Sequence, residues 1–315
     1  MAQSLTHRIR HFGDRGFGYA RAMESALDQG RGAWLVFGLT GQVGDAVRAS
    51  LHAADPALVA VSRAPRPDEG RITWVRDSLE TFSRPAMAVD VIASLGPLDA
   101  FARWFETSSL APARVVALGS TSVHAKMDSP VAAERALARV LREAEHRLAA
   151  AAQARGSALT LLRPTLVYGN GRDRSISRLV RLARRWRALP LPLRAGGLRQ
   201  PVHVDDVAGA VLAALRARLA CTGFFDLPGG ETLPFDEMAR RVLAVGAPGT
   251  RLVRLPGPLF RAGVGLLRGL GRLDDAGAGV LARLDQDQAY DARPARIALG
   301  HYPRGFQPSA ETFPG

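Results

Sequence analysis

The sequence almost entirely lacks lysine and cysteine. Lys126 is its only lysine, so arginine supplies 41 of the 42 basic residues. Cys221 is its only cysteine, which excludes an intrachain disulfide and a zinc site built from several cysteines. A chain without disulfides fits a reducing compartment, and we expect it to be cytoplasmic.

Long apolar runs are absent as well. No segment reaches the roughly 18 uninterrupted apolar residues of a membrane helix. Residues 1–32 lack the apolar core of a signal peptide. We interpret them as an N-terminal extension or as a mis-assigned start, with initiation at Met23. No metal-binding constellation stands out.

Acidic residues are fewer than basic ones, and the formal net charge is +13. This charge predicts attraction to polyanions, anionic lipid or phosphorylated ligands. Aromatic residues make up 6% of the chain and are not interleaved with basic ones, so no nucleic-acid partner is expected. The interpretation we favour from the sequence is an evenly spread arginine surface.

From residue 33 onward, apolar runs alternate with helical patterns, which is typical of βαβ units around a parallel sheet. The fold class predicted is α/β, a Rossmann doubly wound parallel sheet with a smaller C-terminal lobe. The first domain is expected at 33–170 and the lobe at 171–315, with 201–228 returning to the first domain. Strands are expected at 33–38, 57–63, 72–77, 88–96 and 113–120, a sixth strand running into a loop at 158–169, and helices at 44–54, 98–107, 131–155 and 233–246.

The segment VFGLTGQVG follows the first predicted strand and opens the first predicted helix. Its glycines have the spacing G-x-x-G-x-x-G. A tight turn, a close approach by a pyrophosphate and close packing of helix on strand each require a residue without Cβ. The N–H groups at the helix N-terminus then face the anion. We expect a dinucleotide to bind this loop through Gly38, Thr40, Gly41, Gln42, Val43 and Gly44.

The second predicted strand ends at Ser62 and Arg63, where dinucleotide-binding folds read the adenosine ribose. An acidic residue there favours a free 2′-hydroxyl, whereas arginine favours a 2′-phosphate. We therefore expect NADP in preference to NAD. Asp77, which ends the third strand, either accepts from the adenine amine or caps a turn. Leu95, which ends the fourth, completes the predicted cofactor contacts.

Five segments occur in the order GLTGQVG, ALGSTSVHAK, LLRPTLVYGNG, PVHVDDVAGAV and ARLDQDQAYDARPARIALGHYPRGF. Together they resemble the extended short-chain dehydrogenase/reductase family, in its NAD(P)-dependent nucleotide-sugar epimerase/dehydratase branch. The resemblance spans about residues 33–306. It implies a Rossmann domain for the dinucleotide, a C-terminal lobe for a nucleotide-sugar-like substrate, and frequent dimer formation. It also implies that the Pro164 region lies against the nicotinamide.

One feature of that family is missing. The family uses a serine or threonine after the fifth strand and a Tyr-x-x-x-Lys pair on the next helix. The tyrosine is the acid/base, and the lysine lowers its pKa. The resemblance places Ser120 at the catalytic serine, with Ser122 as the alternative and a candidate substrate contact. None of the four tyrosines lies in 131–155, and Lys126 precedes that helix.

The positions of the missing pair correspond to Leu137 and Leu141, which we interpret as the core face of a helix. Three residues are candidates to replace the pair. They are His124, whose imidazole is suited to proton transfer, Lys126, which carries charge, and Tyr168, which follows the sixth strand. All three are expected at the carboxyl edge of the sheet, where ligands bind. The alternatives are an exposed loop lysine, a hydrogen-bonded histidine and a packed tyrosine.

On the substrate side, Arg199 matches a position where the family often places an arginine on the substrate pyrophosphate. Arg283 is the candidate for a second clamp. The planar guanidinium group suits bidentate binding of phosphate. His203 and Asp205 look like a ligand pair, but the resemblance makes them a strand-to-helix cap.

Segments 178–187 and 255–273 alternate basic and apolar residues at helical spacing. Helices of this kind either lie on an anionic membrane surface, which would suit a lipid-linked substrate, or cover a substrate lobe, which is the interpretation favoured here.

Two functions remain open. The first is an NAD(P)-dependent oxidoreductase or epimerase that acts on a nucleotide-sugar or similar phosphorylated sugar. The second is a catalytically inactive dinucleotide-binding protein with a structural, sensing or partner-binding role.

Overall fold

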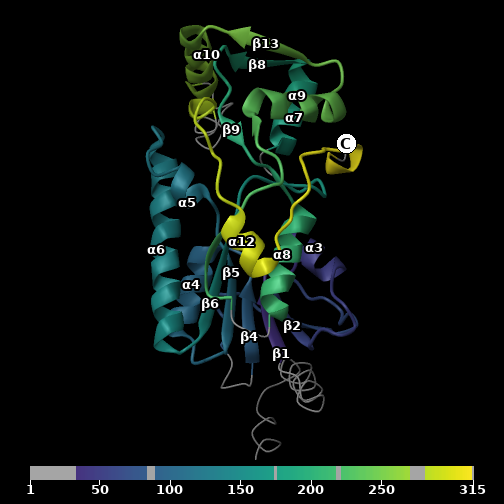
Figure 1. Ribbon diagram of the computed structural model, residues 1–315, viewed down its shortest axis with the longest axis vertical. Helices are drawn as coiled ribbons and strands as arrows, with labels where there is room; N and C mark the ends of the chain where they lie inside the picture. The colour runs from purple at the N-terminus through teal and green to yellow at the C-terminus, as the bar shows by residue number, and fades with distance from the viewer. Residues whose placement is uncertain (1–32, 84–88, 174–175, 218–220, 270–280, 314–315) are drawn as a thin grey trace, which may run out of the picture. The chain divides into compact units, whose positions relative to one another are not determined.

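The computed structural model describes residues 33–83, 89–173, 176–217, 221–269 and 281–313. The predicted N-terminal extension and Met23 lie outside them. A seven-stranded sheet has the order β11-β6-β5-β4-β1-β2-β3, and helices flank it (Figure 1). The pairs β1–β2, β1–β4, β2–β3 and β4–β5 are parallel. The predicted Rossmann-like α/β class is confirmed.

The chain forms two compact units, and its course alternates between them. The first comprises residues up to 119, 144–161 and 211–224, and the second comprises 120–143, 162–210 and 225–315. No helix of the described residues is long and apolar enough to cross a membrane.

The first unit begins with the alternating strands and helices that the apolar periodicity predicts. Its aromatic core surrounds Phe37, whose ring centroid lies 4.7 Å from that of Trp104 and 5.3 Å from that of Phe82. The elements are β1 (Ala33–Phe37), α3 (Gln42–Ala49), β2 (Leu58–Ser62), β3 (Ile72–Arg76), β4 (Val89–Ser94), α4 (Leu98–Thr107) and β5 (Arg114–Leu118).

Helix α3 ends at Ala49, earlier than the predicted 54. The chain turns instead at Asp55, whose carboxylate accepts from the backbone N–H of His52 at 2.8 Å and from Arg216 at 2.7 and 2.8 Å. Arg216 is distant in the sequence, so periodicity alone does not show this end.

Several later elements contain residues of both units. They are α6 (Ala132–Ala154), β6 (Ala158–Pro164), α8 (Val204–Arg216) and β11 (Gly223–Leu227). The strand predicted to run into a loop within 158–169 ends at Pro164, where the N–H of Thr165 donates to Leu227 and its hydroxyl to Gln200. The short strand β7 (Val167–Tyr168) then pairs with β10 (Val202–His203) in a separate parallel pair.

The second unit contains a hydrophobic core of its own, in which Tyr168, Phe235 and Phe306 are buried. A parallel pair, β8 (Ala188–Pro192) with β13 (Arg251–Leu255), was not predicted. The remaining elements are α5 (Ser122–Ala125), α7 (Ile176–Trp186), β9 (Leu198–Arg199), β12 (Leu233–Pro234), α9 (Phe235–Gly246), α10 (Gly257–Gly269), α12 (Arg293–Leu299) and a 3-10 turn at Ala310–Thr312.

Candidate functional site

The glycine-rich loop follows β1 and leads into α3, in the first unit. Gly38 has a φ of 81°, and a Cβ on it would lie 2.7 Å from the backbone nitrogen of Gly96. A Cβ on Gly44 would lie 2.4 Å from the carbonyl oxygen of Gly38. Positive φ and close helix-on-turn packing therefore require glycine at both positions.

Gly41 is the N-cap of α3, and no side chain caps this helix. A Cβ on Gly41 would have only the Gly38 carbonyl oxygen within 4 Å, at 3.3 Å. The space beside the Gly41 backbone is therefore open to a ligand. An uncapped helix N-terminus beside an open glycine fits a pyrophosphate, with Thr40, Gln42 and Val43 completing the loop.

The carboxyl ends of β2 and β3 border a cavity of about 480 Å³ lined by Arg63, Arg76, Asp77, Ser78 and Thr81. Asp77 turns the chain here, since its carboxylate accepts from the Ser78 N–H at 2.8 Å and the Thr81 hydroxyl at 2.5 Å. The second arginine, Arg76, was missed in the sequence because nothing local distinguishes it from the other arginines.

Two other predicted cofactor residues of the first unit have structural partners. The side chain of Ser62 is buried, and its carbonyl accepts from the N–H of Asp77 at 2.9 Å. Leu95 is half-buried, and its N–H donates to Phe37 at 2.9 Å. Its backbone lies directly against Gly38.

The serine segment after β5 belongs to the second unit. The N–H of Ser122 donates to Oγ of Ser120 at 3.1 Å. Thr121 donates to the carbonyl of Pro164 from its backbone at 3.2 Å and from its hydroxyl at 3.3 Å. The structure therefore brings together the serine segment and Pro164, two of the predicted site segments.

His124, on α5, lies in a polar cluster. Its Nε2 is 3.3 Å from Nη1 of Arg163 and 3.6 Å from Oδ1 of Asp226. The Tyr290 ring centroid is 5.9 Å from that of His124, and the Tyr290 hydroxyl is 3.5 Å from the carbonyl of Thr121. Burial raises the pKa of the Tyr290 phenol above its ordinary value. Tyr290 was not among the residues that we predicted for the site, although the sequence has only four tyrosines and their scarcity could have singled it out.

Lys126 belongs to a different cluster. Its Nζ lies 3.6 Å from Oε1 of Glu134, a buried carboxylate that also contacts Arg283 and accepts from the Ser129 hydroxyl at 2.6 Å. Burial, followed by the positive charge of Arg283, lowers the pKa of Lys126 below its ordinary value. The lone lysine is thus held by a structural carboxylate at the start of α6.

The two predicted pyrophosphate clamps are engaged within the protein. The guanidinium group of Arg199 donates to the carbonyls of Leu198, Gln286 and Arg283 at 2.8, 2.6 and 2.7 Å. Arg283 is 4% exposed and paired with Glu134. Binding of substrate phosphate by these two arginines stays a prediction. It requires each guanidinium group to give up its contacts within the protein for contacts with the phosphate.

Tyr168 is buried in the core of the second unit, where its ring packs edge-on against His203 and Phe306. Its hydroxyl lies 3.5 Å from the carbonyl of Gly305. Burial raises the pKa of this phenol. His203 accepts from the N–H of Asp205 at 3.2 Å at the start of α8, which is the geometry of a local cap. No group of three metal-ligating side chains is found in the described part of the chain.

Leu137 and Leu141, at the positions of the missing Tyr-Lys pair, do not form the core face of α6. The interpretation of these two leucines as a core face was therefore wrong. Leu137 is 41% exposed and Leu141 is half-buried, while the neighbouring Val140 is also exposed. The buried face of α6 is formed by Ala138, Ala144 and Leu148 instead. The motif positions therefore remain accessible but carry apolar side chains.

A second cavity, of about 860 Å³, lies wholly within the second unit. Val131 and the first turn of α6, through Ala132 and Ala133, form one wall. Arg194 and Arg261 supply positive charge, and Phe260 supplies an aromatic surface.

Residues 83–221 match the model of the family described as NAD dependent epimerase/dehydratase. The predicted resemblance to the epimerase/dehydratase family is confirmed over this segment. The matched segment includes β5, the serine segment, α6 and β6.

A curated enzyme is similar to part of the chain. The dTDP-L-rhamnose 4-epimerase of Burkholderia thailandensis is 33% identical over 111 residues, which are 33% of this chain and 31% of that enzyme. The chain thus matches about a third of the length of this curated relative.

Solved structures match over most of their length. The structure of MoeE5 in complex with UDP-glucuronic acid and NAD has a TM-score of 0.63 and 19% identity, and the match covers 87% of this chain and 95% of that one. UDP-glucuronic acid 4-epimerase from Bacillus cereus in complex with NAD has a TM-score of 0.62 and 15% identity, with 89% and 95% covered. At these identities the likeness establishes the shared fold.

Proposed function

We propose that this protein is an NAD(P)-dependent oxidoreductase or epimerase that acts on a nucleotide-sugar or a similar phosphorylated sugar. The observation that carries the proposal is the loop Gly38–Gly44, in which the backbone geometry requires glycine at both ends and leaves the N-terminus of α3 uncapped. The family match and the nucleotide-sugar ligands of the similar structures support the substrate class. When bound, the dinucleotide supplies a hydride acceptor or donor.

NADP is the preferred cofactor in this proposal. Arg63 and Arg76 line one cavity at the ends of β2 and β3, and Asp77 is the single carboxylate among its lining residues. Two guanidinium groups suit a 2′-phosphate better than a free 2′-hydroxyl, because each can donate two hydrogen bonds to phosphate oxygens.

In the second unit, Ser120 donates a hydrogen bond to the reacting oxygen, and His124 holds or accepts the proton. Among the three candidate replacements, the side chain of His124 is the most accessible, at 43% exposed. Lys126 is paired with Glu134, and Tyr168 is buried in the core. Asp226 orients the imidazole ring, and the Tyr290 phenol is a second proton-bearing group beside it.

The substrate is proposed to occupy the cavity of about 860 Å³. Arg194 and Arg261 provide charge for its phosphate groups, and Phe260 provides apolar contact.

The alternative function is a dinucleotide-binding protein that has lost catalysis. The specific observation in its favour is that the two motif positions carry apolar side chains, the exposed Leu137 and the half-buried Leu141. An apolar face cannot transfer a proton, although it does not prevent dinucleotide binding elsewhere.

The first experiment is calorimetric titration of the purified chain with NADPH and NADH. We expect NADPH to bind more tightly, and Arg63→Ala and Arg76→Ala each to weaken it about tenfold without changing NADH. Arg66→Ala is the matched control, because Arg66 stacks over Trp74, 5.2 Å from the ring centroid, and does not line the cavity. No binding of either dinucleotide at millimolar concentration would overturn the oxidoreductase proposal.

The second experiment separates the two functions. A panel of nucleotide-sugars is incubated with the protein and NADPH or NADP. Absorbance of the reduced nicotinamide follows net oxidation or reduction, and chromatography of the nucleotide-sugars follows epimerisation, which leaves the cofactor unchanged overall. Turnover that falls about a hundredfold or more in Ser120→Ala and His124→Gln supports the enzyme. Tight dinucleotide binding without turnover on any substrate of the panel supports the alternative.

A further inference from the structure

Positive charge is concentrated in two stretches of the chain. Residues 174–204 contain 8 arginines and residues 238–273 contain 7, and neither stretch has an acidic residue. The rest of the chain therefore has 27 basic and 29 acidic residues, a net charge of −2. The expected even spread of arginine is wrong, because these two stretches account for the whole positive excess.

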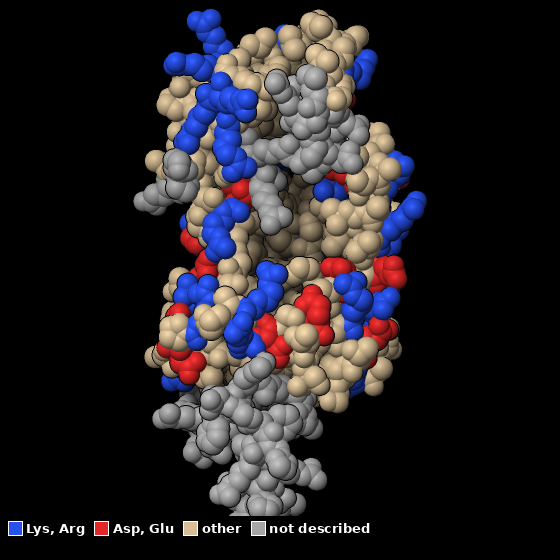
Figure 2. All heavy atoms as spheres, turned by 180° about the vertical axis from the view of Figure 1, so that it is seen from behind, with Lys and Arg blue, Asp and Glu red and all other residues tan. Residues whose placement is uncertain are grey.

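The fold brings the two stretches side by side in the second unit. Strands β8 and β13 pair in parallel from Arg251 opposite Ala188 to Leu255 opposite Pro192. Helices α7 and α10 both contact β8. In Figure 2, the upper end of the molecule shows blue side chains without red ones. We call the surface formed by α7, β8, β13 and α10 the basic surface.

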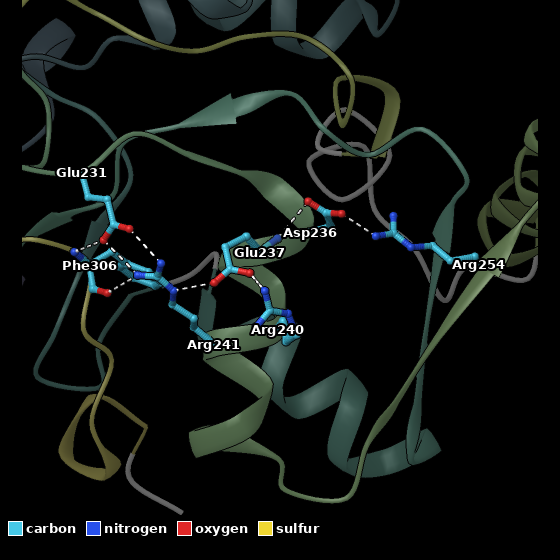
Figure 3. A network of polar contacts seen from close by, with 7 residues as sticks. All are labelled: Glu231, Asp236, Glu237, Arg240, Arg241, Arg254 and Phe306. Carbon is cyan, nitrogen blue, oxygen red and sulfur yellow. Dashed lines mark hydrogen bonds and ion pairs between the residues drawn. The ribbon is translucent and has the colours of Figure 1, made fainter.

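Some arginines near the basic surface are neutralised. Arg241 pairs with Glu231 at 2.8 Å and Glu237 at 2.7 Å, while Arg240 also contacts Glu237 and Arg254 contacts Asp236 (Figure 3). Six exposed arginines form no ion pair with a carboxylate of the described residues. They are Arg181, Arg185, Arg187, Arg194, Arg251 and Arg261.

Large apolar side chains project from the same surface. On α10, Leu259 is 58% exposed and Leu266 is 65% exposed, two turns apart on one face, while Phe260 points into the core. Leu193, Val253 and Trp186 are exposed on the adjoining β8 end, β13 and α7. A surface that served only to bind a soluble polyanion would gain nothing from exposed leucines.

We propose that the basic surface docks this protein on an anionic lipid bilayer. Leu259 and Leu266 enter the boundary between headgroups and acyl chains, and those of the six arginines that do not line the substrate cavity face the lipid phosphates. Charge complementarity selects this partner, because each arginine near an anionic surface strengthens partitioning about fivefold. This inference is independent of the proposed catalytic function.

The test is co-sedimentation of the full chain with sucrose-loaded vesicles of phosphatidylcholine alone or mixed with phosphatidylglycerol. We expect binding to the mixed vesicles only, and loss of binding as salt rises from about 50 mM to about 500 mM. The variant Arg187→Glu/Arg251→Glu reverses two neighbouring charges, since the N–H of Arg251 donates to the carbonyl of Arg187 at 3.1 Å. It should weaken partitioning about 25-fold or more.

Leu259→Ser/Leu266→Ser tests the apolar part and should also weaken partitioning about tenfold or more. Ile297→Ser is the matched control, because Ile297 is 76% exposed in the same unit but lies on α12, outside the basic surface. None of the substituted residues lines either of the two cavities described above. Circular dichroism and thermal unfolding check that each variant is folded.

Four results would overturn the proposal. The first is equal binding to neutral and mixed vesicles, or none to either. The second is vesicle binding that the charge reversal leaves unchanged. The third is binding that soluble polyglutamate abolishes and that the leucine substitutions do not affect, which would identify a general polyanion surface. Loss of a dimer in the leucine variant with unchanged vesicle binding would assign the leucines to a second copy of the chain, and would also overturn it.

Discussion

Lys126 lies 3.6 Å from Glu134, a carboxylate 3% exposed that Arg283 contacts as well. The only lysine of the chain thus belongs to a buried group of two cations and one anion. Taking an ionic group out of water is costly unless its partners compensate, so this group should be sensitive to the loss of any member.

We predict that Glu134→Gln lowers the free energy of unfolding by about 3–5 kcal/mol, because it leaves Arg283 and Lys126 without their shared anion. Urea unfolding followed by circular dichroism measures this. Glu106→Gln is the control, since Glu106 is half exposed and pairs with Arg147 on the surface. Its cost should stay below about 1 kcal/mol. Equal costs for the two variants would contradict the buried cluster.

Lys126 should also make stability depend on alkaline pH. Burial, and then the Arg283 charge, lower the folded-state pKa of Lys126 below its ordinary 10.5. Between those two values the unfolded chain binds more protons than the folded one, so stability rises with pH. We expect wild type to gain stability relative to Lys126→Met as pH rises toward 10.5. Urea midpoints across that range test the sign, and a falling difference would refute it.

The glycine-rich loop gives a prediction with a closely matched control. Gly44→Ala places a Cβ 2.4 Å from the Gly38 carbonyl oxygen and should cost about 1–3 kcal/mol or more, with weakened dinucleotide binding. Gly209→Ala, in helix α8, meets nothing within 4 Å and should stabilise by up to about 1 kcal/mol. Thermal unfolding measures the stability of both variants. If Gly44→Ala left the stability unchanged, the close packing of α3 on the loop would be contradicted.

The exposed face of α6 predicts tolerance of a tyrosine. Leu137→Tyr should change stability by no more than about 0.5 kcal/mol, because Leu137 is 41% exposed. Leu148→Ala, at a fully buried position of the same helix, should cost about 2–5 kcal/mol. Chemical unfolding compares the two. A severe loss with Leu137→Tyr would mean that this leucine packs in a core after all.

Much of the first unit was predictable from the sequence. Strands β1 to β5 and the loop Gly38–Gly44 follow from local rules, since apolar runs, glycine spacing and turn residues act over a few neighbours. The same rules located α6 and α9 nearly to their ends. They misjudged α3, whose end depends on the pairing of Asp55 with Arg216.

The site was predictable only in part. Arg63 was expected at the end of β2, but its neighbour across the cavity, Arg76, was not. Asp226 and Tyr290 lie beside His124 although they are far from it in the chain. No local signal shows that either residue lies beside His124, because the fold alone decides which distant side chains meet.

By itself the sequence determined the sheet-forming segments, the glycine-rich loop and the absence of a Tyr-x-x-x-Lys pair, since each depends on residue type and spacing along one stretch. The tertiary structure decided that Lys126 is paired with Glu134 and that two arginine-rich stretches meet through β8 and β13. Such partners are chosen by packing between segments distant in the chain, where the gain from burying apolar surface outweighs the local preferences that a sequence displays.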